Sequence, residues 1–183
     1  MRTKLFILIL ALQSLWVLAT VAVQEHKLRS GQEILLETRP VDPRDLLRGD
    51  YMTLAYEITE VPRSAFIPVA TNQPAEGTPV FVRLQATGKF FMVQNASFTP
   101  LTAEKGHPVL RGKINNRWMA GHAGETLRVE YGLEKYFVPE GMGNPAGKLT
   151  VAVAVTSSGN AIIKRLYVDG KPFGTNSKDP KPE

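Results

Sequence analysis

The sequence contains no cysteine, which excludes disulfide bonds, a thiol nucleophile and thiolate metal ligands. It has only three histidines, His26, His107 and His122, and no two of them have the spacing of metal ligands on one helix or strand. The hydrolase elbow Gly-x-Ser-x-Gly, a phosphate-binding loop and His-Glu-x-x-His are also missing. We therefore expect no metal site, no cofactor and no catalytic residues, and hence a protein that is not an enzyme.

A dense basic surface is missing as well. The formal net charge is +5, and Arg2 and Lys4 supply two of these charges before an apolar segment begins. Nucleic-acid binding calls for clustered Lys and Arg with interleaved aromatic residues, so we expect no nucleic-acid partner. With 183 residues, of which 43% are hydrophobic and 21% charged, the chain is long enough for one domain with a buried core.

The long apolar run is Leu5–Val23, which no charged residue interrupts. At about 1.5 Å per residue it reaches roughly 28 Å, close to the ~30 Å hydrocarbon core of a bilayer. Arg2 and Lys4 precede it, and the positive-inside rule then places the N-terminus in the cytoplasm. We expect residues 1–24 to form a single-pass transmembrane anchor, with the rest of the chain on the extracytoplasmic side.

A cleaved signal peptide is the alternative for the same segment. Residues 17–19 and 20–22 both end in alanine, as cleavage sites do. The apolar run is longer than the usual signal-peptide core of about 7–15 residues, which favours an uncleaved anchor. Both interpretations put the following domain on the same side of the membrane.

The rest of the chain is punctuated by turn residues and leaves little room for long helices. We expect a polar linker over residues 25–32, a β-rich domain over 33–174 and a flexible tail over 175–183. Short helical turns are predicted at Val41–Leu47 and Leu133–Phe137. The fold class is mainly β, a small antiparallel barrel or sandwich with one N-terminal transmembrane helix. Strands are predicted at Gln32–Thr38, Tyr51–Thr59, Val80–Thr87, Lys89–Phe98, Val109–Ile114, Thr126–Tyr131, Lys148–Thr156 and Ala161–Val168.

A Gly49–Asp50 corner leads directly into the alternating stretch Tyr51–Thr59. Its alternation predicts one core-facing row of side chains, which comprises Met52, Leu54, Tyr56 and Ile58. Such residue types suit a corner and a strand start, which favours a structural role. The other interpretation is a charged and aromatic ligand-binding surface, whose candidate residues are Arg44, Asp45, Arg48, Asp50, Tyr51 and Glu140.

Three glutamates, Glu130, Glu134 and Glu140, cluster in the sequence. Glu130 and Glu134 would share a face only if one helix spanned both, and Gly132 between them argues against such a helix. We expect these carboxylates to be solvated or salt-bridged.

Two long stretches and the final hairpin together resemble the GDYXXLXY family. They are Pro40–Ile58, which contains Gly-Asp-Tyr-x-x-Leu-x-Tyr, Glu130–Gly141, and the hairpin that ends at Gly170. With the anchor, the resemblance covers most of the chain. It implies a bacterial protein of unknown function, anchored in the inner membrane with a periplasmic domain, whose genes often lie beside multi-pass membrane proteins. It brings no established catalytic or binding residue.

The leading hypothesis is an accessory protein that binds a multi-pass membrane protein. An alternative is a cell-envelope enzyme that uses the carboxylates of Asp42, Asp45, Asp50 and Glu140, with Tyr51 or His122 as proton carrier. A third is a carrier of a small ligand or lipid inside a barrel. For the carrier, the residues expected to line a void are Met52, Leu54, Val82, Phe91, Val151 and Val153.

Overall fold

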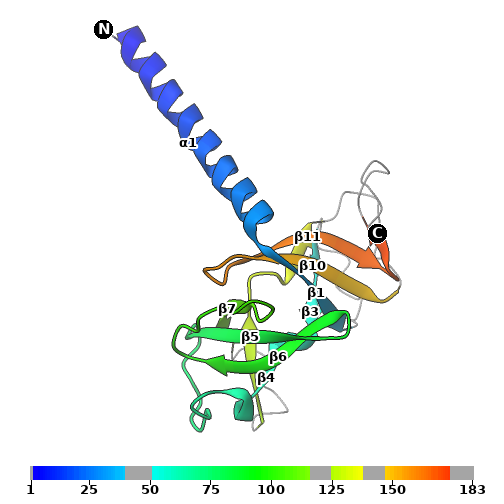
Figure 1. The fold of residues 1–183 in the computed structure, drawn as a ribbon. Coiled ribbons are helices and arrows are strands. Elements are labelled where there is room, and N and C mark those ends of the chain that lie inside the picture. The colour runs from blue at the N-terminus through cyan, green and yellow to red at the C-terminus, as the bar shows by residue number, and fades with distance from the viewer. Residues whose placement is uncertain (1, 40–50, 116–124, 138–146, 174–183) are drawn as a thin grey trace.

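The computed structural model describes residues 2–39, 51–115, 125–137 and 147–173 of the chain (Figure 1). One long helix, α1 (Arg2–Ser30), leads into a head built of antiparallel strands. This arrangement confirms the predicted fold class, a mainly β protein with one N-terminal apolar helix. The predicted helical turn at residues 41–47 and the tail at 175–183 lie outside the described residues.

Helix α1 continues beyond the apolar run, through most of the predicted polar linker. It ends at Ser30, so that Gly31 alone separates it from the first strand, β1 (Gln32–Arg39). Glutamate, lysine, leucine and arginine after Gln24 all have high helix propensity. A polar composition therefore did not mean an irregular backbone here.

The first sheet has the strand order β12-β11-β10-β1-β3. Its centre is the hairpin of β10 (Leu149–Val155) and β11 (Ala161–Val168), which confirms the predicted pair of strands. β1 pairs antiparallel with β10, with Ile34 opposite Val153. A sharp turn at Asp169 and Gly170, both with positive φ, returns the chain as β12 (Lys171–Phe173).

The second five-stranded sheet has the order β4-β8-β7-β5-β6. The predicted strands on both sides of Gly88 are present as β5 (Pro79–Thr87) and β6 (Phe90–Ser97). All its strand pairs are antiparallel. The remaining strands of this sheet are β4 (Glu60–Pro62), β7 (Val109–Ile114) and β8 (Thr126–Glu130).

One hydrophobic core joins the two sheets. The first sheet contributes inward side chains such as Ile34 and Val151, and the second contributes side chains such as Val82 and Leu110. In Figure 1, β10 and β11 lie above β5 and β6, while α1 leaves the head on the side of the first sheet. Each sheet thereby contributes one face to the core, and in β10 the small side chains of Ala152 and Ala154 on the other face are buried as well.

The stretch Tyr51–Thr59 is divided rather than one continuous strand. It forms β2 (Tyr51–Thr53), β3 (Ala55–Tyr56) and a 3₁₀ turn at Glu57–Thr59 before β4 begins. β3 pairs with β1 of the first sheet and β4 with β8 of the second. Of the predicted core-facing row, Leu54, Tyr56 and Ile58 are buried, as expected.

The predicted helical turn at Leu133–Phe137 is wrong. Residues Lys135–Phe137 form a strand, β9, which pairs antiparallel with β2 in a two-stranded ribbon. The backbone hydrogen bonds that a helical turn would make locally are made instead to a segment far away in the sequence. A three-residue stretch carries no periodicity from which this pairing could have been predicted.

Candidate functional site

The two stretches that carry the family resemblance meet inside the head. The ribbon brings Tyr51 opposite Phe137, and the register continues to Thr53 opposite Lys135. Beyond the ribbon, the backbone N–H of Leu54 donates to the carbonyl of Glu134 at 2.7 Å. Just beyond the two stretches, β4 pairs with residues 126–128 of β8. The ribbon therefore joins the signature to the second motif, and the segments that adjoin them pair as β4 and β8.

Between these paired ends, two buried tyrosines cross from one stretch to the other. The phenol of Tyr56 donates to the backbone carbonyl of Leu133 at 2.8 Å. The phenol of Tyr131 donates to the backbone carbonyl of Ile58, also at 2.8 Å. The exposed fractions are 0% for Tyr56 and 7% for Tyr131. We call these four residues the two-tyrosine junction.

Burial raises the pKa of Tyr56 and of Tyr131 above the ordinary phenol value, and the nearby carboxylate of Glu134 raises both further. Both phenols consequently remain protonated hydrogen-bond donors at physiological pH. A tyrosine that carries protons during catalysis needs a pKa moved toward neutrality. The environment of the junction moves both values the other way, which suits a structural joint.

Glu134 completes the turn that presents Leu133. Its carboxylate accepts a hydrogen bond from the backbone N–H of Tyr131 at 2.6 Å, and Gly132 between them has a φ of +79°. Burial raises the pKa of the Glu134 carboxyl, hydrogen bonds from backbone N–H groups partly offset that, and the neighbouring charge of Glu130 raises it again. Glu134 is half-buried, so the expectation of a solvated carboxylate holds only in part, and its carboxylate is held by a backbone hydrogen bond. Glu130 is exposed and accepts from the Asn115 side chain, so there the expectation of a solvated carboxylate is confirmed.

The structure describes only one of the candidate binding residues, Tyr51. Tyr51 lies in β2, where its backbone pairs with that of Phe137. The other binding candidates lie outside the described residues, as do Asp42 and His122 of the enzyme hypothesis. These other candidates are Arg44, Asp45, Arg48, Asp50 and Glu140.

The residues named for a ligand-carrying barrel mostly fill the interior. Leu54, Val82, Val151 and Val153 belong to the core cluster and are at most 1% exposed, and Phe91 packs against that cluster. The Met52 side chain lies outside the described part of the chain. Where the structure describes the chain, no group of three or more histidines and carboxylates is placed to hold a metal ion.

One surface feature escaped the sequence analysis. Within the described residues, the exposed large hydrophobic side chains all belong to α1 except Ile67 and Val69, which are 63% and 58% exposed. They lie in the loop between β4 and β5, which is at the end of the head away from α1 in Figure 1. We call Ile67–Val69 the apolar tip. An isoleucine and a valine in a stretch otherwise rich in proline and polar residues were the available signal.

Arg63 braces the loop that carries the apolar tip. Its guanidinium donates to the carbonyls of Ala70 and Asn72 at 3.1 and 2.8 Å, and to the side-chain oxygen of Gln73. On the inner side, the tip is backed by the buried Phe66, whose ring stacks on that of Phe98. The tip is therefore held outward by buried and hydrogen-bonded neighbours.

The fold and the junction together define a class of protein: a two-sheet β head that follows one long apolar helix. The family model for the GDYXXLXY protein matches residues 13–166, most of the chain. The chain belongs to the GDYXXLXY family, which confirms the resemblance seen in the two motifs. Comparison with curated proteins and with solved structures gave no significant match.

Proposed function

We propose that this protein is a non-enzymatic accessory protein, anchored in the inner membrane by α1, whose periplasmic head binds a multi-pass membrane protein. The observation that carries the proposal is the apolar tip, which exposes two aliphatic side chains on a braced loop. Apolar side chains that are held together on the surface mark candidate contact sites for other proteins.

The anchor is supported by the length and surroundings of α1. Residues Lys4–Glu25 are long and apolar enough to cross a bilayer, and none of this span is buried against the rest of the protein. A water-soluble protein would leave a long row of leucine, isoleucine and valine side chains in contact with water. A signal sequence passes the same test of length and composition, so the proposal includes retention of the helix.

The proposed orientation rests on the charged residues at the N-terminal end of α1. Arg2 and Lys4 precede the apolar run Leu5–Val23, and Lys27 and Arg29 follow it. Each end thus carries two Lys or Arg residues, and the proposal takes Arg2 and Lys4, of which Lys4 directly adjoins the apolar run, as the cytoplasmic pair, with the head outside. Because the apolar tip lies away from α1 (Figure 1), the partner would contact it through an extramembrane segment.

The proposal is tested by site-specific photo-crosslinking of the full-length chain in native membranes. A photoreactive phenylalanine analogue replaces Ile67, and a matched variant carries it at Thr87, an exposed position in β5. We expect an adduct with an integral membrane protein from position 67 and none from position 87. The same adduct at both positions, or none at position 67, would overturn the proposed contact.

A second pair of variants separates the tip from the loop around it. With the probe at the exposed Thr71, the change Ile67→Ser together with Val69→Ser should reduce the adduct several-fold. The exposed Glu76 changed to Gln serves as the control and should leave the yield unchanged. An unchanged yield in the double-serine variant would mean that the aliphatic side chains do not contribute to binding.

A further inference from the structure

The side chains in the middle of α1 are not all apolar. Inside the span Lys4–Glu25, away from its ends, the polar side chains are Gln13, Ser14 and Thr20. Gln13 is about one and a half residues from the middle of this span, which corresponds to roughly 2 Å along the helix axis. In an anchored chain, its carboxamide would lie close to the centre of the bilayer.

Two of the three polar side chains are satisfied within the helix. The hydroxyl of Ser14 donates to the carbonyl of Leu10 at 2.9 Å, and that of Thr20 donates to the carbonyl of Val17 at 2.7 Å. Among the described residues, Gln13 has no such partner. A carboxamide in hydrocarbon without hydrogen bonds costs several kcal/mol, roughly 2–7, so its two donors and its carbonyl oxygen require a partner from outside this helix.

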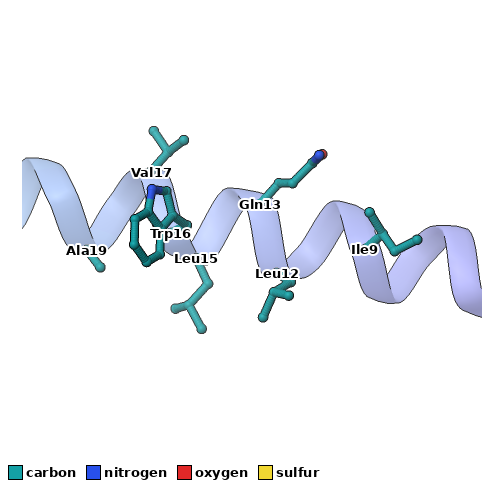
Figure 2. A pocket seen from close by; sticks show the side chains of 7 residues that line it. All are labelled: Ile9, Leu12, Gln13, Leu15, Trp16, Val17 and Ala19. Carbon is teal, nitrogen blue, oxygen red and sulfur yellow. The ribbon is translucent and has the colours of Figure 1, made fainter.

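A second polar group lies on the same side of the helix. Trp16 is one turn after Gln13 and 73% exposed, and its indole N–H has no acceptor in the described part of the chain. Figure 2 shows Gln13 and Val17 extending from one side of α1 with Trp16 beside them, whereas Leu12 and Leu15 point the opposite way. Tryptophan usually lies at the membrane interface, so a tryptophan near the middle of a span is unusual.

We infer that the Gln13–Trp16 side of α1 is a contact surface for α1 of a second copy of this chain. This rests on the proposed anchoring. Copies inserted in the same orientation present Gln13 at the same depth, and a carboxamide is both donor and acceptor, so two of them can satisfy each other across a two-fold axis. The Trp16 indole N–H, one turn further along, is an additional donor that the Gln13 oxygen of the other copy can accept.

A second copy fits this surface better than an unrelated helix. An unrelated helix would have to carry a polar side chain at the depth of Gln13, whereas a second copy does so by symmetry. Hydrogen bonds of this kind, together with close packing, drive association of helices in lipid because apolar contacts alone gain little over lipid tails.

Cysteine scanning maps the contact, because the chain has no cysteine of its own. At 100° per residue, positions 9 and 20 lie within about 40° of Gln13, and positions 11 and 18 lie about 140–160° away. The full-length variants Ile9→Cys, Thr20→Cys, Ala11→Cys and Leu18→Cys are oxidised in phosphatidylethanolamine–phosphatidylglycerol vesicles. We expect the first two to form disulfide-linked dimers at least about five times faster than the last two.

The role of the carboxamide is tested in the Ile9→Cys variant. Gln13→Leu should weaken self-association about tenfold, and Gln13→Asn should largely preserve it. Ser14→Ala is the matched control, since that hydroxyl is already bonded within its own helix, and it should leave association unchanged. Equal cross-linking on both sides of the helix, or an unchanged Gln13→Leu variant, would overturn the inference.

Alkaline extraction separates this inference from the proposed function. If the chain stays in the membrane pellet but fails the cross-linking tests, the helix contact is contradicted and the proposed anchor is supported. If the chain is found in the supernatant, both the helix contact and the anchor are contradicted. In cell membranes, an Ile9→Cys adduct with another membrane protein in place of the dimer would assign the surface to that protein and overturn the second copy as occupant.

Discussion

At the scale of single residues, the two-tyrosine junction explains why tyrosine rather than phenylalanine stands at position 56. The Leu133 carbonyl lies in the interior, where water does not reach it, and the Tyr56 phenol is its partner. Tyr131 does the same for Ile58. Leaving a buried carbonyl without its donor lowers the free energy of unfolding by about 1–3 kcal/mol. Each hydroxyl therefore contributes to stability although it is only one atom larger than the hydrogen of phenylalanine.

We expect Tyr56→Phe and Tyr131→Phe each to lower the free energy of unfolding by about 1–3 kcal/mol, because each leaves a buried carbonyl without a donor. For a protein of this size, that corresponds to a Tm lower by roughly 2–4 °C per kcal/mol. Denaturant unfolding of the full-length protein in detergent, followed by circular dichroism, measures the change. Tyr136→Phe is the control, since the partly buried Tyr136 has no hydrogen-bonded hydroxyl among the described residues, and its effect should stay within about 0.5 kcal/mol.

Glu134 makes the junction sensitive to pH. Because the folded protein raises the pKa of its carboxyl, the folded state binds more protons than the unfolded chain between the ordinary carboxyl pKa and the raised value. The free energy of unfolding contributed by Glu134 therefore falls as pH rises through that window. Below the window the carboxyl is protonated in both states, and the contribution no longer changes with pH.

Glu134→Gln removes this dependence and leaves an oxygen that can accept from the Tyr131 N–H. We expect the stability of this variant relative to the original protein to increase as pH rises above the ordinary carboxyl range, and then to level off. Thermal unfolding at a series of pH values measures the difference. Glu125→Gln, a change at an exposed position, should give a flat difference, and a Glu134→Gln curve equally flat would show that burial of this carboxyl is not linked to folding.

At the scale of elements, residues 51–62 connect all three sheets. β2 pairs in the ribbon, β3 with the first sheet and β4 with the second. The strand with which the chain pairs changes every two or three residues. The guanidinium of Arg39 in β1 forms ion pairs with the carboxylates of Glu57 and Glu60 at 2.9 and 3.1 Å, which link this segment to the first sheet. A stretch that joins both five-stranded sheets and the ribbon requires particular residues for structural reasons alone.

The sequence predicted the elements that form locally. The β10–β11 hairpin was predictable because alternating apolar residues flank a turn with Gly159, and the same holds for β5 and β6 around Gly88. The junction was not predictable, since Tyr56 and Leu133 are 77 positions apart. Nothing in either motif alone indicates which tyrosine meets which carbonyl, and the partial burial of Glu134 depends on that contact.

The loop between β4 and β5 gives a prediction at this scale. Arg63→Gln loses the three-point guanidinium contact that closes residues 63–73. With each lost hydrogen bond worth about 1 kcal/mol, we expect backbone amides of residues 66–73 to exchange with deuterium at least about tenfold faster. Peptides from β6 should be unaffected and serve as the internal control. Unchanged exchange in the loop would mean that Phe66 and the backbone alone hold the apolar tip.

At the scale of the whole molecule, the helix and the head form a continuous unit. α1 passes from the apolar span to Ser30 without a break, and β1 begins after a single glycine. The residues from Glu25 to Ser30 extend the helix by roughly 8 Å beyond the span. An anchored head would thus lie close to the membrane surface, with the first sheet nearer the bilayer and the apolar tip farther from it (Figure 1).

This placement predicts the depth of Trp16. Trp16 is roughly 2 Å from the middle of the span Lys4–Glu25, so its fluorescence should be quenched most by lipids brominated deep in the acyl chains. The chain has two tryptophans, and Trp118→Phe leaves Trp16 as the single reporter. The measurement uses the full-length protein in vesicles that contain lipids brominated at graded depths.

The matched control moves the reporter along the same helix. In a chain with Trp118→Phe, Trp16→Phe and Val23→Trp, the indole lies near the end of the span, and shallow bromines should quench it best. A depth difference between positions 16 and 23 requires that α1 crosses the hydrocarbon, because a helix lying along the membrane surface would give both positions the same shallow profile. Retention of the N-terminal residues, measured by intact mass on protein from cell membranes, then distinguishes an anchor from a signal sequence that has been removed.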